Sequence, residues 1–567
     1  MSTSPPTRSP PERIGPLRSR RGCKVCKTRK VKCGEEKPSC CRCITSRYKC
    51  EYDSPTTYSY ASGPSTNSLL DLPVSSFPNT VWRERRAFAY YFQHAAPYLA
   101  GGLDQHFWGS VVPQMCRTEP AVWDAVNAIS TLFESPEICL DFVFLSLRHE
   151  KSRFLNQEQS EALGWYLRSL SKIRTQIERG KVDAAVALIS CVLFMCIESL
   201  QGHVEEALQL YGQGTKLILD LRAMRCSPAQ ATLREDTLVP LFIRLGTAAL
   251  TISGVPVSDL LSELEFEGEY KFASLESARD SLVSLAAQVL VLQKETGDNP
   301  FIGLEAQITP KLWAKQIYLR ERLNHWYRAY AALSQSIQTR SSSLETRSGI
   351  AALLLAFHTT LAVIVATCLS RSGSVFDAHL PDFRTIVEQA GLSLEASGSP
   401  DGTQPAFTFE LGVGLPLYFT ALECREPGLR RKALELLRKA PPMQGFHKTA
   451  PGLAIAAKVM QLEEEFSKNM HVENASEAQN PGKYHLPTPP HDDKEEGRPN
   501  PMRIPEEARV RHYCVFRPRD QPFLLGPHDV RKWNRSPDQL YIRFTRNRRD
   551  PVNETLWHLT DECVPMD

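Results

Sequence analysis

Six cysteines between residues 23 and 50 have the residue type and the spacing of metal ligands. They form two copies of the pattern C-x2-C-x6-C, joined by a further six-residue gap, at Cys23, Cys26, Cys33, Cys40, Cys43 and Cys50. Structural zinc takes four tetrahedral ligands, and closely spaced thiolates are typical of such sites. Two ions require eight ligand positions, so six cysteines hold two zinc ions only if two thiolates are shared. Cys41 interrupts the symmetry of the pattern, and we expect it to stay outside the ligand set.

Zinc is also the expected source of this segment's folding energy. About thirty residues cannot bury enough apolar surface to fold alone, and the interval offers few large apolar side chains. Metal binding is then coupled to folding. Disulfide bonds are the alternative use of clustered cysteines, but residues 1–21 are polar, Pro-rich and basic, without the apolar stretch of a secretory signal. Metal ligation is therefore the preferred interpretation.

The cysteine segment lies in a strongly basic part of the chain. Residues 1–53 contain 14 Lys and Arg against 5 Asp and Glu, whereas the rest of the chain contains 53 against 59. Because six thiolates outweigh two divalent ions, part of the basic excess compensates the cluster itself. The remainder is the electrostatic footprint expected for binding to nucleic-acid phosphates. Its basic clusters also favour import into the nucleus.

The run RGCKVCKTRKVKCGEEKPSCCRCITSRYKCEY resembles the fungal binuclear zinc-cluster transcription factors. The resemblance implies that two zinc ions are held by the six cysteines, with Cys23 and Cys40 bridging both metals. Cys26 and Cys33 would complete one site, and Cys43 and Cys50 the other. It also implies that each half is a short helix after a metal-bound turn.

The same resemblance implies how double-stranded DNA is read. In the family, the helix between the second and third cysteines enters the major groove, and the matching positions here are Arg29 and Lys30. Arg or Lys donating to guanine is the commonest specific base contact, which suits GC-rich triplets. Five further basic residues are assigned to phosphates, which position a protein without reading sequence; they are Lys27, Lys32, Arg42, Arg47 and Lys49.

The rest of the chain divides by composition. We expect a disordered basic tail at residues 1–18, the zinc cluster at 19–53 and a flexible linker at 54–80, which is rich in Ser, Thr, Pro and Gly with one charge, Asp71. No sustained heptads follow the cluster, so the sequence does not predict a coiled-coil dimer.

Residues 81–467 predict a large all-α helical array. Helical spacing of apolar residues recurs, as at Val204, Ala207, Tyr211 and Ile218, and alternation of strand type is scarce. Several stretches resemble the all-helical regulatory domain of the same family, through Phe107, Trp108, Glu198, Gly202, Pro416, Cys424 and Arg425. We interpret these residues as core, turn and buried polar positions. The uncharged run Ser348–Ser370 is long enough to span a membrane, but as a single run it favours a buried core helix.

The C-terminal part has two predicted segments. Residues 468–507 are polar and rich in Pro, Asn and acidic residues, which predicts a disordered linker. Residues 508–567 form a basic tail in which Arg509–Val515 and Leu540–Phe544 alternate as in a short hairpin or sheet. This tail is free to pack on the helical array or to touch acidic partners.

The sequence therefore predicts a sequence-specific nuclear DNA-binding regulator of transcription, and not an enzyme, since hydrolase, phosphate-loop and dinucleotide motifs are missing. Secondary-metabolite or catabolic gene clusters are the target classes that the resemblance suggests. A second copy of the chain and transcriptional co-regulators are left open as partners, and no membrane is expected. The alternative is a scaffold that uses the zinc knot and the helical array for protein contacts, and a small-ligand site in the array also stays open.

Overall fold

The computed structural model describes the cysteine segment, the helical body and most of the C-terminal strands. The described residues are 23–29, 31, 33, 39–50, 82–136, 156–180, 183–224, 228–252, 259–262, 270–297, 301, 307–338, 344–399, 402–410, 412–478, 504–521, 524, 538–549 and 557–566. The chain contacts divide it into two compact units, Met1–Pro78 and Asn79–Asp567. We describe each unit by itself.

The first unit contains two short helices, α1 (Lys24–Thr28) and α2 (Cys41–Thr45). Each begins directly after a cysteine in extended conformation, Cys23 at ψ 157° and Cys40 at ψ 145°. Among the described residues of this unit the buried ones are cysteines, and Val25 and Val31 are their partly buried aliphatic neighbours. The prediction of a small cysteine-folded module with a short helix after each cysteine turn is confirmed.

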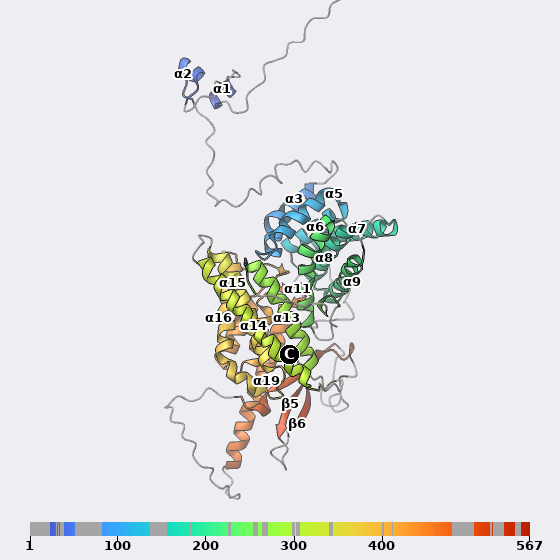
Figure 1. Cartoon of the computed structure of the whole chain (residues 1–567), viewed down its shortest axis with the longest axis vertical. Helices are drawn as coiled ribbons and strands as arrows, with labels where there is room; N and C mark the ends of the chain where they lie inside the picture. Colours follow the sequence, from blue (N-terminus) through green and yellow to red (C-terminus); the bar gives the residue numbers. More distant parts are fainter. Residues whose placement is uncertain are drawn as a thin grey trace, which may run out of the picture. The chain divides into compact units, whose positions relative to one another are not determined.

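We call the second unit, Asn79–Asp567, the body. Its N-terminal half is built from helices of 4 to 22 residues (Figure 1). They are α3 (Trp82–Tyr90), η2 (Tyr91–Ala95), α4 (Ala96–Leu99), η3 (Phe107–Val111), α5 (Val112–Thr118), α6 (Pro120–Glu134), α7 (Gln157–Glu178), α8 (Ala184–Leu200), α9 (Val204–Arg222), α10 (Pro228–Thr232), η4 (Leu233–Leu238), α11 (Val239–Leu250) and α12 (Asp259–Ser262). Gly202, at φ 77°, makes the tight turn between α8 and α9.

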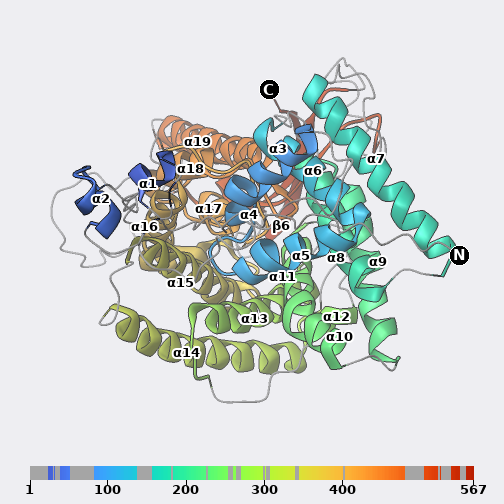
Figure 2. The same cartoon turned by 90° about the horizontal axis from the view of Figure 1, so that it is seen from above.

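The C-terminal half of the body continues the array with longer helices. They are α13 (Leu275–Thr296), α14 (Pro310–Gln338), α15 (Leu344–Thr367), η6 (Gly373–His379), α16 (Leu380–Ser397), α17 (Gly414–Glu423), α18 (Pro427–Lys439) and α19 (Thr449–Ala478). Helix α14 lies at the outer edge, with α13 and α15 on its inner side (Figure 2). Helix α19 runs to Ala478, past the predicted end of the array at residue 467.

Prolines explain the three π-helical turns η2, η3 and η4. Each turn ends two residues before a proline, at Pro97, Pro113 and Pro240. Proline lacks an amide hydrogen and its ring clashes with the carbonyl four residues earlier. A wider π turn removes that clash and lets the helix continue.

Two small sheets complete the body. The first joins β1 (Phe407–Thr408), β2 (Met443–Gln444) and β3 (His447–Lys448), with β1 parallel and β3 antiparallel to β2. The second is an antiparallel sheet of β4 (Val510–Phe516), β5 (Tyr541–Arg549) and β6 (Trp557–Pro565), in the order β4-β5-β6. The predicted short β tail thus contains a third strand, β6, beyond the two predicted segments.

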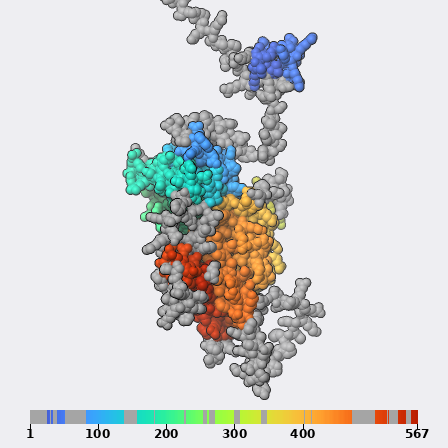
Figure 3. All heavy atoms as spheres, turned by 180° about the vertical axis from the view of Figure 1, so that it is seen from behind, coloured from blue at the N-terminus to red at the C-terminus, as the bar shows by residue number. Residues whose placement is uncertain are grey.

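The C-terminal sheet packs on the helices. Val510, Ile542 and Phe544 belong to the same apolar core as α13 to α19. The Tyr513 hydroxyl lies 2.6 Å from that of Tyr418 on α17. From behind, the strands' surface adjoins that of the C-terminal helices (Figure 3).

Two large apolar cores, beside two smaller clusters, hold the described part of the body together. The first lies among α3 to α12 and the β1–β2 segment, and contains Trp108 and Trp123; the second lies among α13 to α19 and contains Trp326. Buried ion pairs join the two cores, because Arg279 on α13 contacts both Asp104 (3.0 Å) and Glu410 (2.7 Å), while Arg244 on α11 also contacts Asp104. Such groups are tolerated inside a protein only when they are paired.

Helix α15 is the segment with membrane-like composition. By length and hydropathy its residues Arg347–Thr367 could cross a bilayer, but 72% of the most apolar window is buried within the body. Tyr330 of α14 donates to the Ala351 carbonyl of α15, and Gln316 of α14 donates to the carbonyl of Val365. In the structure this helix is part of the second core.

Candidate metal centre

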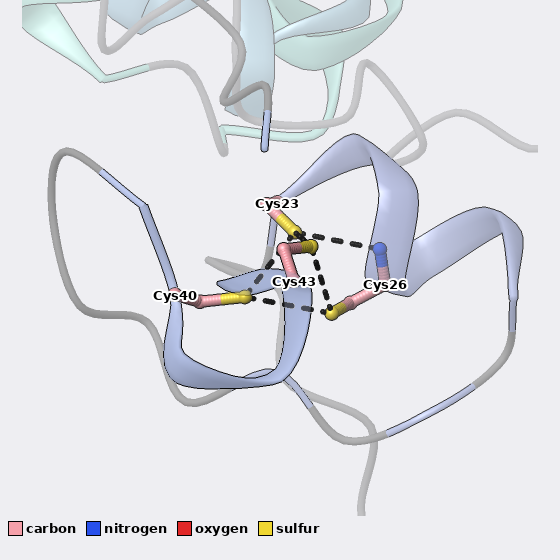
Figure 4. Close-up of side chains that lie close together, drawn as sticks. All are labelled: Cys23, Cys26, Cys40 and Cys43. Atoms are coloured by element: carbon pink, nitrogen blue, oxygen red, sulfur yellow. Dashed lines mark hydrogen bonds between the residues drawn. The ribbon is translucent and has the colours of Figure 1, made fainter. Parts of the chain in front are cut away.

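Four cysteine sulfur atoms meet at the centre of the first unit. The Sγ atoms of Cys23, Cys26, Cys40 and Cys43 all lie within 4.8 Å of one another (Figure 4). The Cys23–Cys40 and Cys23–Cys43 separations are 3.8 and 3.6 Å, and those from Cys26 to Cys40 and Cys43 are 3.7 and 3.9 Å. Zinc–sulfur bonds of about 2.3 Å in a tetrahedron place sulfur atoms about 3.8 Å apart. The sulfur atoms therefore lie at the separations of zinc ligands, and in the arrangement that the resemblance implies they are the two bridging cysteines with one terminal cysteine of each site.

The two outer cysteines occupy equivalent positions in the two halves. The Cys23 amide donates to Cys33 Sγ at 3.3 Å, and the Cys40 amide donates to Cys50 Sγ at the same distance. Each outer sulfur is thereby held against the first cysteine of its own half. Cys33 is buried and Cys50 is half-buried. The structure thus brings four of the six predicted ligands into one quartet and places the other two beside it.

The halves also end their helices alike. In α2, the Tyr48 amide donates to the Cys43 carbonyl (2.9 Å) and the Arg47 amide to the Ile44 carbonyl (3.1 Å), which is a Schellman cap. In α1, the Val31 amide makes the matching bond to the Cys26 carbonyl. Arg47 takes the left-handed conformation at φ 52°, where glycine is usual. The chain is therefore bent the same way after the second cysteine of each half.

The pKa values of the clustered thiols differ between the cysteines of the quartet. Burial raises the pKa of Cys26 to about 12 and also raises that of Cys43. Burial alone would raise the pKa of Cys23 and Cys40, but hydrogen bonds from backbone amides and neighbouring thiols lower it overall. Zinc binds thiolates, so binding must displace the protons of the whole set. The residues present fit zinc, because a bound cation compensates the negative charge that the buried thiols acquire when they lose their protons.

Exposed basic side chains surround the cysteines. Lys27, Arg29, Arg42, Arg47 and Lys49 are all exposed. Lys30 and Lys32, the other predicted DNA contacts, lie outside the described residues. A side chain must be exposed to contact DNA. The five exposed Lys and Arg residues meet this condition, and they lie on both halves of the unit.

The sequence interpretation missed a contact between the halves. The Arg29 guanidinium, at the end of α1, lies 4.2 Å from the centre of the Tyr48 ring, which follows α2. A cation over an aromatic face is attracted by about 0.5–1 kcal/mol at an exposed site. The contact restricts where Arg29 points. An aromatic residue inside a basic interval was the available signal, but the sequence alone did not say which cation it would meet.

Comparison with known proteins identifies the first unit. Residues 21–59 match the family described as the fungal Zn(2)-Cys(6) binuclear cluster domain. The chain therefore carries a zinc-binding domain of this family, as the resemblance in its cysteine pattern predicted.

Two curated proteins extend the comparison. The chain is 25% identical over 405 residues to the aspercryptin biosynthesis cluster-specific transcription regulator of Emericella nidulans; the match covers 66% of this chain and 63% of that protein. It is 30% identical over 134 residues, or 20% of the chain, to an uncharacterized transcriptional regulatory protein of Schizosaccharomyces pombe, of which 24% is covered. The chain thus spans less than two thirds of the length of either relative. No solved structure matches it.

Proposed function

We propose that this protein is a nuclear, sequence-specific DNA-binding regulator of transcription. The observation that carries the proposal is the cysteine quartet at zinc-ligand distances inside a match to the zinc-cluster domain, surrounded by exposed Lys and Arg. A basic surface on a metal-held knot is suited to phosphate contact. The two relatives, each described as a regulator of transcription, support the same activity.

The proposed ligand set contains two zinc ions and all six cysteines. Cys23 and Cys40 would bridge both ions, Cys26 and Cys33 would complete one site, and Cys43 and Cys50 the other. The hydrogen bonds that hold Cys33 and Cys50 against the bridging pair support this division, because each keeps a terminal sulfur beside a shared one. In this arrangement zinc supplies structural cross-links, while the protein's own basic residues make the DNA contacts.

Two kinds of DNA contact are proposed for the exposed residues. Arg29 and Lys30 would donate to guanine in the major groove, with Tyr48 holding the Arg29 guanidinium in place. Lys27, Lys32, Arg42, Arg47 and Lys49 would contact phosphates. The body would then determine when the regulator is active or which partners it meets. The name of the relative in Emericella nidulans supports a biosynthetic gene cluster as the target class.

A matched pair of substitutions tests this division of contacts. The zinc-loaded protein is titrated against a GC-rich triplet duplex and a scrambled duplex, by fluorescence anisotropy, over a range of salt concentrations. Arg29→Ala should weaken binding to the GC-rich duplex by about 1–3 kcal/mol and reduce the preference for it. Arg42→Ala, an exposed arginine of the other half, should weaken both duplexes about equally and reduce the salt slope by about 1.

The same titration separates regulator from scaffold. If the unsubstituted protein binds both duplexes equally, base reading is refuted. If the zinc-loaded protein binds neither duplex, the result favours a scaffold for protein contacts and contradicts DNA binding.

A further inference from the structure

Strand β4 forms one wall of a large cavity in the body. The cavity has a volume of about 700 Å³, and all five residues from Arg509 to Tyr513 line it. The other walls come from the ends of α11, α13, α15 and α17 and from the turn after α15. Because β4 is an edge strand of the sheet β4-β5-β6, its unpaired side is available to face the cavity.

A β-bulge lies in β4 at the cavity wall. Val510 pairs with Arg546 of β5 and His512 pairs with the next residue, Thr545, so Arg511 has no residue opposite it. A bulge of this kind bends the strand and redirects the extra side chain, and such irregularities are common beside functional sites. Here the extra residue is an arginine in the lining of a cavity.

Arg511 differs from its neighbours in having no partner among the described residues. Arg509 contacts Asp377 at 2.7 Å, and Arg425 contacts Glu463 at 2.9 Å. Arg511 is half-buried, yet no hydrogen bond or ion pair to it exists in the described part of the body. Glu506 and Glu423 act on Arg511 electrostatically, but neither forms an ion pair with it, and a partly desolvated cation without such a contact is unfavourable. Burial accordingly lowers the pKa of Arg511.

The rest of the lining contains both cationic and apolar side chains. Lys294 and Arg371 are further lining cations, and burial together with Arg511 and Arg371 lowers the pKa of His512 to about 4. Glu423 is the one carboxylate among the described lining residues, and it contacts Arg425 at 2.9 Å. The apolar lining residues include Leu250, Ile252, Leu290, Phe376, Phe419 and Leu422.

Helix ends account for part of this charge. Helices α11, α13 and α15 finish at the cavity, and cations near helix C-termini offset their partial negative charge. Lys294, in the last turn of α13, is explained in this way. Arg511 is not, because it belongs to a strand of the C-terminal sheet.

We propose that this cavity binds a small molecule in which a carboxylate is joined to an apolar group, with Arg511 as its principal cationic contact. A planar guanidinium matches a carboxylate with two parallel hydrogen bonds. The paired hydroxyls of Tyr418 and Tyr513 also line the cavity, and the pair has one further donor to offer, since one of the two hydrogens is used between the hydroxyls. Such an occupant contacts both the sheet and the helix ends, so it stabilises the attachment of β4 to the body. This site is independent of the DNA-binding function proposed for the first unit.

Thermal unfolding of the full zinc-loaded chain tests the proposal. The probes are hexanoate, octanoate and benzoate, each compared with its neutral amide at the same ionic strength. Binding to the folded state raises the melting temperature of the body. We expect a rise with the carboxylates, larger for octanoate than for hexanoate, and none with the amides. Equal responses to each acid and its amide would overturn the proposal.

Matched variants identify the contact. Arg511→Ala should weaken carboxylate binding by about 10- to 100-fold, as expected for loss of hydrogen bonds to a charged group. Arg438→Ala removes an exposed arginine of α18 and should leave binding unchanged. Without ligand, R511A should melt no lower than the unsubstituted protein, whereas R509A should melt lower because it loses Asp377. If R511A is as unstable as R509A, or binds the carboxylates as well as R438A does, the proposal is wrong.

Discussion

The zinc-cluster unit and the helical body bury polar groups by opposite means. In the first unit the buried groups are cysteine thiols, and the nearest opposite charge must come from bound metal. In the body the buried groups include Arg, Asp and Glu, and most of these charges meet an opposite charge on another side chain, as Arg279 meets Asp104 and Glu410. The stability of the first unit therefore depends on bound metal, whereas that of the body depends on its own side chains. A chelator and a core substitution should therefore act on different units.

Zinc removal is expected to have the largest effect and to separate the units completely. A strong chelator should abolish DNA binding, because the apolar contacts of the first unit are too few to hold it without metal. The helical signal and the melting temperature of the body should stay as they were. Circular dichroism and DNA anisotropy on one sample measure both, and added zinc should restore binding. DNA binding that survives chelation would show that the first unit does not depend on metal.

Breaking a buried ion cluster should damage the body alone. Glu463 on α19 is fully buried and accepts hydrogen bonds from Arg425, Arg430 and the Val510 amide, at 2.9, 2.7 and 2.9 Å. Glu463→Gln leaves the buried Arg430 guanidinium without a carboxylate and leaves Arg425 with Glu423 alone, so it should cost about 3–5 kcal/mol of unfolding free energy.

Its neighbour in sequence provides the control for this loss. Glu464 pairs with the exposed Arg431 at 2.7 Å, so Glu464→Gln should cost at most about 1 kcal/mol in the same denaturant titration. Similar losses for the two variants would contradict the importance assigned to burial, and loss of zinc from E463Q would contradict the separation of the units.

Acid should destabilise the body through a buried histidine. His358 lies between the rings of Trp326 and Tyr327, with Nε2 3.0 Å from the Leu323 carbonyl, and burial lowers its pKa from 6.5 to about 4. Between pH 6.5 and pH 4, His358 is protonated in the unfolded chain but neutral in the folded chain, so the free energy of unfolding falls as the pH falls. At about pH 5 the loss is about 2 kcal/mol.

Substitution tests this slope. His358→Phe keeps the ring stacking, loses the hydrogen bond and should flatten the decline of unfolding free energy between about pH 6.5 and pH 4. The slope should not vanish, because the pKa of His512 is also lowered to about 4. His325→Gln, at an exposed position of α14, is the control. A decline of unchanged steepness in H358F would exclude His358 as its source.

The smallest expected effect lies in the first unit. Arg47→Gly relieves a left-handed backbone conformation, while the unfolded chain gains freedom, so we expect a net gain of about 0.5–1 kcal/mol. Zinc competition against a chelator should show tighter retention, although DNA binding weakens through loss of the charge. Ser46→Gly, at a right-handed position one residue earlier, should not retain zinc better. Equal retention by both variants would show that the Arg47 conformation carries no strain.

The zinc-cluster unit was predictable because its information is local. The spacing of six cysteines indicated the metal and the two short helices, and the basic residues between them indicated the exposed surface. What escaped prediction was the contact of Arg29 with Tyr48. It depends on how the two halves are folded together, which no spacing along the chain reveals.

The body was predictable in class, but little of its polar interior was predictable beyond Arg425, which is buried and ion-paired as expected. Apolar periodicity indicated helices, and Trp108 and Gly202 occupy the core and turn positions expected of them. The sequence pattern does not distinguish Arg279, Arg430 and Glu463 from the exposed charges of an amphipathic helix, so their burial was not predicted. Strand β6 was missed because its alternation is largely polar, with most of its side chains exposed or half-exposed. The bulge at Arg511 likewise depends on pairing with β5, some thirty residues away.

The first apolar core has a consequence for how the chain is made. Besides residues of α3 to α12, it contains Phe407, Phe409, Met443 and Phe446 from the segment around β1 and β2. A growing polypeptide can form the early helices as they leave the ribosome, but it cannot close this core until about residue 446 has emerged. Contacts so distant in sequence slow folding and leave apolar surface exposed meanwhile. A nascent chain halted before Phe407 should therefore be a client of chaperones, even though every helix up to α12 has been synthesised.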